Sequence, residues 1–200
     1  RAGVLWQNGG TVWGWELNGT TVASQGGVGI VGAGWALAGT GDLDGNGRAD
    51  AVFRNAAGDL YAWRMNGLGV ASGVGIGSLP SEWQLAGMGD LDGNGTADML
   101  WRRGSDGALY SWLMQDTAVT GGAWIGALPD WSVAALSDFT GDGRSDILLR
   151  KTDGTLFIAQ MAGASPSAWL GVGAMGAEWA VRGAGDTNAD GRSDMIWQNT

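Results

Sequence analysis

Short runs in which large apolar residues alternate with other residues recur along the chain, and they predict β-strands. The runs are TVWGWEL (11–17), LYAWRM (60–65), LYSWLM (109–114) and LFIAQM (156–161). In the second run, Tyr61, Trp63 and Met65 share one face of the strand, and apolar Leu60 and Ala62 lie on the other. Because both faces carry apolar side chains, the pattern predicts a sheet that is covered on both sides.

The strand pattern repeats with a period of 48 residues. Tryptophan recurs at this spacing, at Trp35, Trp83, Trp131 and Trp179. A glycine-punctuated apolar segment closes each repeat, and no stretch combines helical spacing with a capping residue. About four short strands in a repeat of this length are typical of a propeller blade. The sequence therefore predicts an all-β fold, a β-propeller of four-stranded blades with about four blades.

We expect a single repeat domain over residues 1–200. Its parts are a partial blade at 1–34, full repeats at 35–82, 83–130 and 131–178, and a partial blade at 179–200. The opening string RAGVLWQN matches RSDMIWQN near the end, so the two partial blades together would complete a fourth blade with one strand duplicated. The four blades could close on themselves, or the chain could be a section of a longer array or an open assembly.

Each repeat also holds an acidic string of nine residues, such as DLDGNGRAD (42–50). We call these strings acidic loops 1 to 4 and number their positions 1 to 9. Oxygen-bearing side chains stand at positions 1, 3, 5 and 9, and the carbonyl of position 7 lies between them. Because glycines allow a tight curl, this spacing suits a loop that wraps a hard cation, and calcium fits best.

The predicted calcium ligands follow this numbering in every loop, with position 7 contributing its backbone carbonyl. They are Asp42, Asp44, Asn46, Arg48 and Asp50; Asp90, Asp92, Asn94, Thr96 and Asp98; Asp138, Thr140, Asp142, Arg144 and Asp146; and Asp186, Asn188, Asp190, Arg192 and Asp194.

The charge of the ligand side chains is the same in every loop, −3, which supports a shared cation. Where position 3 loses its aspartate to Thr140 or Asn188, position 5 becomes aspartate, so every loop keeps three carboxylates. Asp-Gly and Asn-Gly turns are common without any metal, but four such loops in register would crowd mutually repelling carboxylates. An EF-hand is excluded because position 12 is apolar in all four loops.

At this point the sequence resembles the FG-GAP/VCBS-type calcium-binding repeats of integrin α-subunit β-propellers and of many secreted bacterial proteins. The segment LAGMGDLDGNGTADMLWR (85–102) carries the D-x-D-G-N-G-x-x-D core of that family, followed by an apolar strand. The resemblance implies that the loop joins the first and second strands of a blade. It also implies a secreted or cell-surface module used in adhesion, in lectins or beside polysaccharide-degrading enzymes. Loops 3 and 4 depart from the core at positions 3 and 5.

The 13 tryptophans suggest both packing and carbohydrate binding. Those that recur with the repeat, or alternate with Phe53 and Leu149, are interpreted as core residues. Trp15, Trp63 and Trp112 vary more, since Ala159 replaces them in another repeat, and they are the candidate sugar-stacking residues.

Composition removes several function classes. The chain has no Cys and no His, which excludes thiol nucleophiles, His-based triads and the usual zinc sites. A net charge of −9 argues against nucleic acid and anionic membranes as partners, and no apolar run reaches the roughly 18 residues of a membrane span. The carboxylates outside the loops form no recurring pair, so we expect no catalytic residues and no enzyme.

The leading hypothesis is an extracellular, noncatalytic module with up to four structural Ca²⁺ ions that binds a glycan or an extracellular protein surface. A second hypothesis is a building block that self-associates through its incomplete terminal blades into a ring or filament. A third is an accessory domain of a polysaccharide-degrading enzyme. The mass in solution would separate the second from the first, because a closed propeller should stay near 20.5 kDa.

Overall fold

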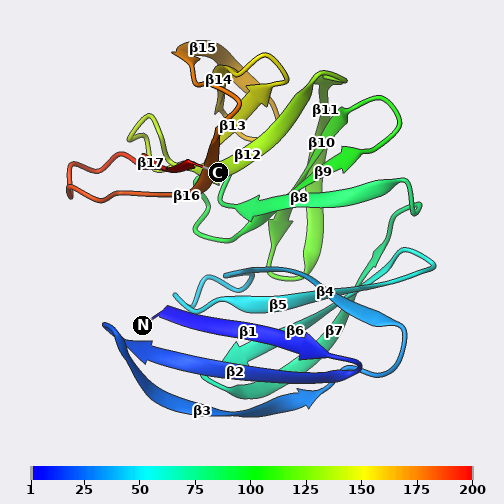
Figure 1. Cartoon of the computed structure of the whole chain (residues 1–200). Helices are drawn as coiled ribbons and strands as arrows, with labels where there is room; N and C mark the ends of the chain where they lie inside the picture. Colours follow the sequence, from blue (N-terminus) through cyan, green and yellow to red (C-terminus); the bar gives the residue numbers. More distant parts are fainter. Residues whose placement is uncertain (1, 200) are drawn as a thin grey trace. The chain divides into compact units, whose positions relative to one another are not determined.

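The computed structural model describes residues 2–199, which form antiparallel strands and no helix (Figure 1). Within that range no segment therefore has the long apolar helix that crossing a membrane would require. The expected all-β architecture of propeller-type blades is confirmed.

Three sheets have four strands each, in the order of the sequence. They are β4 (Trp35–Gly41), β5 (Asp50–Asn55), β6 (Asp59–Asn66) and β7 (Gly69–Ser78); β8 (Trp83–Gly89), β9 (Asp98–Arg103), β10 (Ala108–Gln115) and β11 (Ala118–Ala127); and β12 (Trp131–Ser137), β13 (Asp146–Lys151), β14 (Thr155–Met161) and β15 (Pro166–Ala174). Each sheet begins at one of the recurring tryptophans, so the 48-residue period of the sequence is the period of the blades.

Two smaller sheets contain the remaining strands. They are β1 (Ala2–Asn8), β2 (Thr11–Asn18) and β3 (Thr21–Ile30), and β16 (Trp179–Gly185) with β17 (Asp194–Asn199). The contacts divide the chain into two compact units. Unit 1 comprises residues 1–81 and 116–118, and unit 2 comprises residues 82–115 and 119–200. The prediction of a single domain over residues 1–200, and that of self-association, stay predictions.

In each unit the core lies between the faces of neighbouring sheets. In unit 1 it is built around Val12, Phe53, Trp63 and Met65. In unit 2 one cluster gathers Leu91, Leu100, Leu109, Ile147 and Leu149, and a second gathers Phe139, Leu148, Leu156 and Ile158. Both faces of β6 contribute buried side chains, as the alternating pattern predicted, because the central strands are covered on both sides.

A polar side chain near the end of β1, β9 or β13 reaches backbone carbonyls at the start of the next sheet. Gln7 Nε2 donates to the carbonyl of Trp35 at 2.6 Å, and Arg102 Nη2 donates to that of Trp131 at 3.0 Å. Arg150 Nη1 donates to Trp179, and its Nη2 donates to Gly176 at 2.7 Å. We call Gln7, Arg102 and Arg150 the cross-blade residues.

Replacing a cross-blade arginine should lower stability. We expect Arg150→Met to reduce the free energy of unfolding by about 2 kcal/mol, because it leaves several carbonyl oxygens without their charged donor. Urea denaturation followed by tryptophan fluorescence measures the change. The neighbouring Lys151→Met, which removes only a surface pair with Asp153, is the matched control. Equal losses in the two variants would show that the cross-blade contact contributes nothing.

Candidate metal centre

Every acidic loop connects the first and second strands of its blade, as the resemblance implied. Loop 1 joins β4 to β5, loop 2 joins β8 to β9, loop 3 joins β12 to β13 and loop 4 joins β16 to β17. The curl of loop 1 needs left-handed backbone at Gly45 (φ 71°) and Gly47 (φ 81°), which glycine adopts without strain. The glycines of the acidic strings therefore shape the loops.

The first aspartate closes each loop onto itself. In loop 1, Asp42 Oδ1 accepts the amide of Asn46 at 3.1 Å and Oδ2 accepts the amide of Gly47 at 2.6 Å. The corresponding glycine amides of the other loops, Gly95, Gly143 and Gly191, donate to their first aspartate at 2.8, 2.8 and 2.9 Å. Four loops of different sequence therefore share one conformation.

The last aspartate fastens the loop to the third strand of the blade. Asp98 is fully buried, and its Oδ2 accepts the amide of Leu91 at 2.7 Å while Oδ1 accepts the amide of Met114 at 2.6 Å. Asp50 and Asp146 are buried in the same way, each with a methionine amide of the third strand as donor. Sequence reasoning missed this role, although the methionine that ends each LYAWRM-type run was its visible signal.

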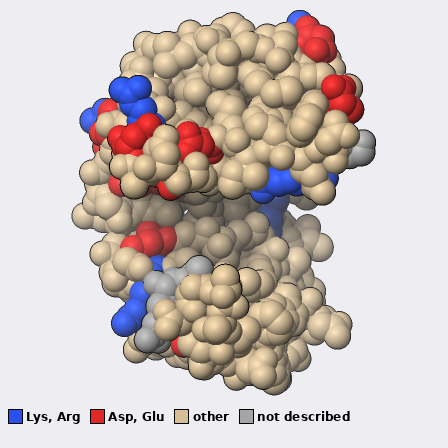
Figure 2. Space-filling view, turned by 60° about the vertical axis from the view of Figure 1, so that its left-hand side comes forward, with Lys and Arg blue, Asp and Glu red and all other residues tan. Residues whose placement is uncertain are grey.

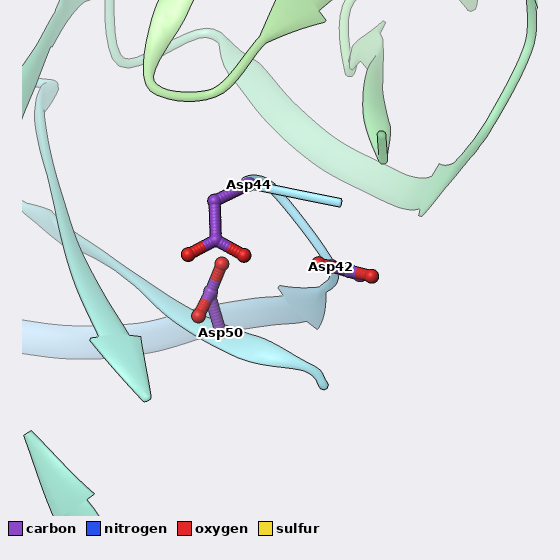
Figure 3. A group of neighbouring side chains, drawn as sticks. All are labelled: Asp42, Asp44 and Asp50. Carbon is purple, nitrogen blue, oxygen red and sulfur yellow. The ribbon is translucent and has the colours of Figure 1, made fainter. Parts of the chain in front are cut away.

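Loops 1 and 2 each bring three carboxylates together. Oxygen atoms of Asp42, Asp44 and Asp50 all lie within 4.8 Å of one another, and those of Asp90, Asp92 and Asp98 do the same. Figure 3 shows the carboxylates of Asp44 and Asp50 facing each other across loop 1. Among the salt bridges found within residues 2–199, none involves these six aspartates.

This arrangement fits a hard cation. Carboxylates at this spacing repel one another unless a positive charge lies between them, and oxygen-only donors are the ligands that calcium prefers. The loop glycines supply only backbone amides, which partly offset the charge. Figure 2 shows that the visible Asp and Glu side chains form compact groups on an otherwise largely uncharged surface, so the acidity is local.

Loops 3 and 4 differ from loops 1 and 2. Their carboxylates stand at positions 1, 5 and 9, whereas those of loops 1 and 2 stand at positions 1, 3 and 9. In loop 3, Asp142 at position 5 accepts a hydrogen bond from Gln160 Nε2 at 3.3 Å and lies 4.0 Å from Arg144 Nη1. Within residues 2–199, only loops 1 and 2 form a three-carboxylate group as compact as 4.8 Å. We therefore expect the four loops to differ in their affinity for a cation.

Burial changes the proton affinity of the last aspartate. Desolvation raises the pKa of Asp98 to about 6, even though two backbone amides favour its charged form. Desolvation likewise raises the pKa of Asp50 and of Asp146. In loop 4 the pKa of Asp194 is lowered instead, because the Thr187 hydroxyl and amide both donate to it.

The three candidate sugar-stacking tryptophans occupy different environments. Trp63 is only 7% exposed and packs against Phe53, with ring centroids 4.7 Å apart. Trp112 is half-buried against Trp101. Trp15 is 37% exposed and lines a groove within unit 1. Of the three, Trp15 is the tryptophan that presents a ring to a groove.

The fold and the loops define a protein of β-propeller repeats with acidic hairpin loops. The sequence profile of the FG-GAP-like repeat matches residues 42–101, which span loop 1, loop 2 and the blade strands between them. These residues therefore form an FG-GAP-like repeat, and the resemblance to FG-GAP/VCBS-type repeats is confirmed.

One solved structure with a similar fold is the Tc holotoxin pore of Photorhabdus luminescens, with a TM-score of 0.52 and 13% sequence identity. The similarity covers 98% of this chain but 12% of the toxin chain, so this chain spans a small part of the length of its structural relative. At this identity the likeness shows the fold alone. No curated protein matches the sequence.

Proposed function

We propose that the chain is a noncatalytic calcium-binding propeller module that acts outside the cell and binds a glycan or a protein surface. The observation that carries the proposal is the recurrence of three crowded carboxylates in a preformed oxygen-rich loop. In loops 1 and 2 the side chains at positions 1, 3, 5 and 9 and the carbonyl at position 7 would hold the ion. Calcium would offset the negative charge of the three carboxylates in each loop, and it would hold each hairpin rigid.

The proposed extracellular location follows from the structural role of the calcium ions. Four bound ions would bring the formal charge from −9 to −9 + 8 = −1. Because their proposed role is structural, these ions would have to stay bound for as long as the protein is folded. A structural requirement of this kind is met by the millimolar calcium found outside cells, whereas cytosolic calcium is far lower.

Calcium should raise the melting temperature. A ligand that binds only the folded state stabilises it by about 2.7 kcal/mol per site at a concentration 100 times its Kd. We expect a shift of several degrees between EDTA and about 2 mM calcium in calorimetry, with a much smaller shift in magnesium, which demands stricter octahedral geometry. Asp44→Asn with Asp92→Asn should remove the part of the shift that comes from loops 1 and 2. Identical melting curves in EDTA and calcium would refute the proposal.

A groove in unit 1 supports the ligand-binding part of the proposal. It has a volume of about 1030 Å³, and Trp15, Glu16 and Asn66 line it. Arg48 Nη1 donates to Asn66 Oδ1 at 2.6 Å beside the groove. An indole with neighbouring hydrogen-bonding groups suits a sugar ring. Among the groove residues Glu16 is the one carboxylate, whereas glycoside hydrolysis generally uses a pair, and this supports a noncatalytic role.

Loop 1 forms part of the wall of this groove, through residues 46–49. We therefore expect glycan binding to depend on calcium. A glycan array in calcium and in EDTA would find the sugar class, and calorimetry on the best hit would compare Trp15→Ala with Trp13→Ala. Trp13 lies on the same strand and is 42% exposed, but it does not line the groove. We expect about a tenfold loss of affinity for Trp15→Ala alone, the size of one lost aromatic contact. No binding across the array would favour a protein surface as the ligand.

A further inference from the structure

The acidic loops of neighbouring blades in unit 2 contact one another through their backbones. The amide of Ser145, at position 8 of loop 3, donates to the carbonyl of Asp90 at position 1 of loop 2, at 2.5 Å. The amide of Ser193, at position 8 of loop 4, donates in the same way to Asp138 of loop 3 at 2.7 Å. The same contact between the same positions therefore occurs at two successive blade boundaries.

Each contact joins a peptide group of one candidate metal site to a peptide group of the next. The Ser145 amide is in the same peptide group as the carbonyl of Arg144, the position 7 ligand of loop 3. On the other side, the Asp90 carbonyl shares its peptide group with the Leu91 amide, which donates to Asp98 Oδ2 at 2.7 Å. Two peptide groups therefore connect a ligand atom of loop 3 to a ligand side chain of loop 2.

The boundary between loops 3 and 4 repeats this connection. The Arg192 carbonyl, a position 7 ligand, shares its peptide group with the Ser193 amide, and the Phe139 amide donates to Asp146 Oδ2 at 3.1 Å. The side chains add to the contact, because Arg144 Nε donates to the carbonyl of Asp92 at 3.2 Å.

We propose that calcium binding at loops 2, 3 and 4 is positively coupled, so that an ion in one loop increases the affinity of the adjacent loop. The inference rests on the proposed calcium function. A cation at the Arg144 carbonyl would polarise that peptide group and strengthen the hydrogen bond from Ser145 to Asp90. It would also fix the position of the loop 2 peptide group whose Leu91 amide donates to the ligand Asp98.

Repulsion between the bound ions opposes this effect, because filling a loop changes the charge of its ligand side chains from −3 to −3 + 2 = −1 and weakens the attraction of the adjacent loop for its own ion. The proposed coupling requires the hydrogen-bonded contact to outweigh this loss. Coupling energies between binding sites typically correspond to factors of about 5 to 150 in affinity. We expect a value at the lower end of this range, because a single main-chain hydrogen bond joins each pair of loops.

The test needs a separate signal from each loop. The amides of Gly95, Gly143 and Gly191 serve this purpose in ¹⁵N NMR, because each donates to the first aspartate of its own loop. Loop 3 is disabled by Asp138→Asn with Asp142→Asn. The ligand side chains of the disabled loop keep a charge of −1, equal to that of the filled wild-type loop, so the neighbouring loops experience the same charge as beside a filled loop although no ion is bound.

We expect the calcium midpoints at Gly95 and Gly191 to rise about fivefold or more when loop 3 is disabled. Disabling loop 4 by Asp186→Asn with Asp190→Asn should raise the midpoint at Gly143 by the factor that disabling loop 3 produces at Gly191, since coupling is reciprocal. Midpoints that stay within about twofold of the wild-type values would overturn the coupling while leaving calcium binding intact. Glycine amides that do not respond to calcium would overturn the proposed function, and the coupling with it.

A second variant tests the hydrogen bond itself. Ser145→Pro removes the amide that donates to Asp90 but keeps every ligand atom, and Ser145→Ala keeps that amide. We expect only the proline variant to lose the coupling between loops 2 and 3, while the coupling between loops 3 and 4 persists. Unchanged coupling in a folded proline variant would overturn the role of this hydrogen bond. If the proline variant does not fold, the disabled-loop experiments still decide the proposal.

Discussion

Asp98→Ala should destabilise the protein by about 3 kcal/mol in EDTA, where no calcium can contribute. The substitution leaves the buried amides of Leu91 and Met114 without an acceptor, and each unpaired buried donor costs about 1 to 3 kcal/mol. Removal of the buried charge relieves its desolvation and its repulsion from Asp90 and Asp92, and this offsets part of that cost. The free energy of unfolding, measured by urea denaturation in EDTA, gives the result.

Asp92→Ala is the matched control, because it removes a carboxylate from the same loop. The hydrogen bonds found for the Asp92 carboxylate come from Asn94, within the exposed part of the loop. We expect this variant to lose little stability in EDTA, whereas both variants should lose calcium stabilisation. If Asp92→Ala and Asp98→Ala were equally stable in EDTA, the anchoring role of Asp98 would be wrong, and its only function would be that of a ligand.

The metal-free protein should become less stable as the pH rises from about 4 to 7. The pKa of Asp98 is about 6 in the folded protein and near 3.8 when unfolded, so the folded state binds the proton more tightly. The contribution is fully present below pH 3.8 and is lost as the pH rises through 6. A difference of about two pKa units corresponds to roughly 3 kcal/mol, and the raised pKa values of Asp50 and Asp146 act in the same direction.

Calcium should reverse this dependence, because the ion competes with the proton for the same carboxylates. Urea midpoints at pH 4.5, 5.5, 6.5 and 7.5, with EDTA or with saturating calcium, measure both slopes. Asp98→Asn is the control, since residue 98 can then no longer titrate; the slope in EDTA should fall to the part that Asp50 and Asp146 contribute. Half-buried Asp106 and exposed Asp153, whose pKa values are lowered to about 2 by donors nearby, titrate below this window. A metal-free stability that rises between pH 4 and 7 would contradict the burial of a proton-binding Asp98.

The sequence by itself determined the repeat, the strands and the connection that carries each acidic loop. These features depend on local pattern. Tryptophan every 48 residues marks the start of β4, β8, β12 and β16, and alternating apolar residues specify β6, β10 and β14. The glycine spacing of the acidic strings specifies the curl of the loops, because only glycine adopts left-handed backbone without cost. The likeness to FG-GAP-like repeats could therefore be found from residues alone.

Only the tertiary structure decided what each residue of the site does. Asp98 is an anchor as well as a candidate ligand because Met114, 16 residues further on, folds back beside it. Trp63 is buried and Trp15 is exposed, although both occupy the same place in the repeat, because different neighbours cover them.

The contacts between blades were equally hidden in the sequence. The hydrogen bond from Ser145 to Asp90 joins residues 55 positions apart, and the one from Arg102 to Trp131 joins residues 29 apart. A repeat pattern specifies each blade but not the atoms at which two blades meet. The packing of the apolar faces of the sheets determines those atoms, because burying these faces brings the loops of successive blades together. The sequence therefore determined the 48-residue period, whereas the hydrogen bonds between neighbouring blades could be found only in the tertiary structure.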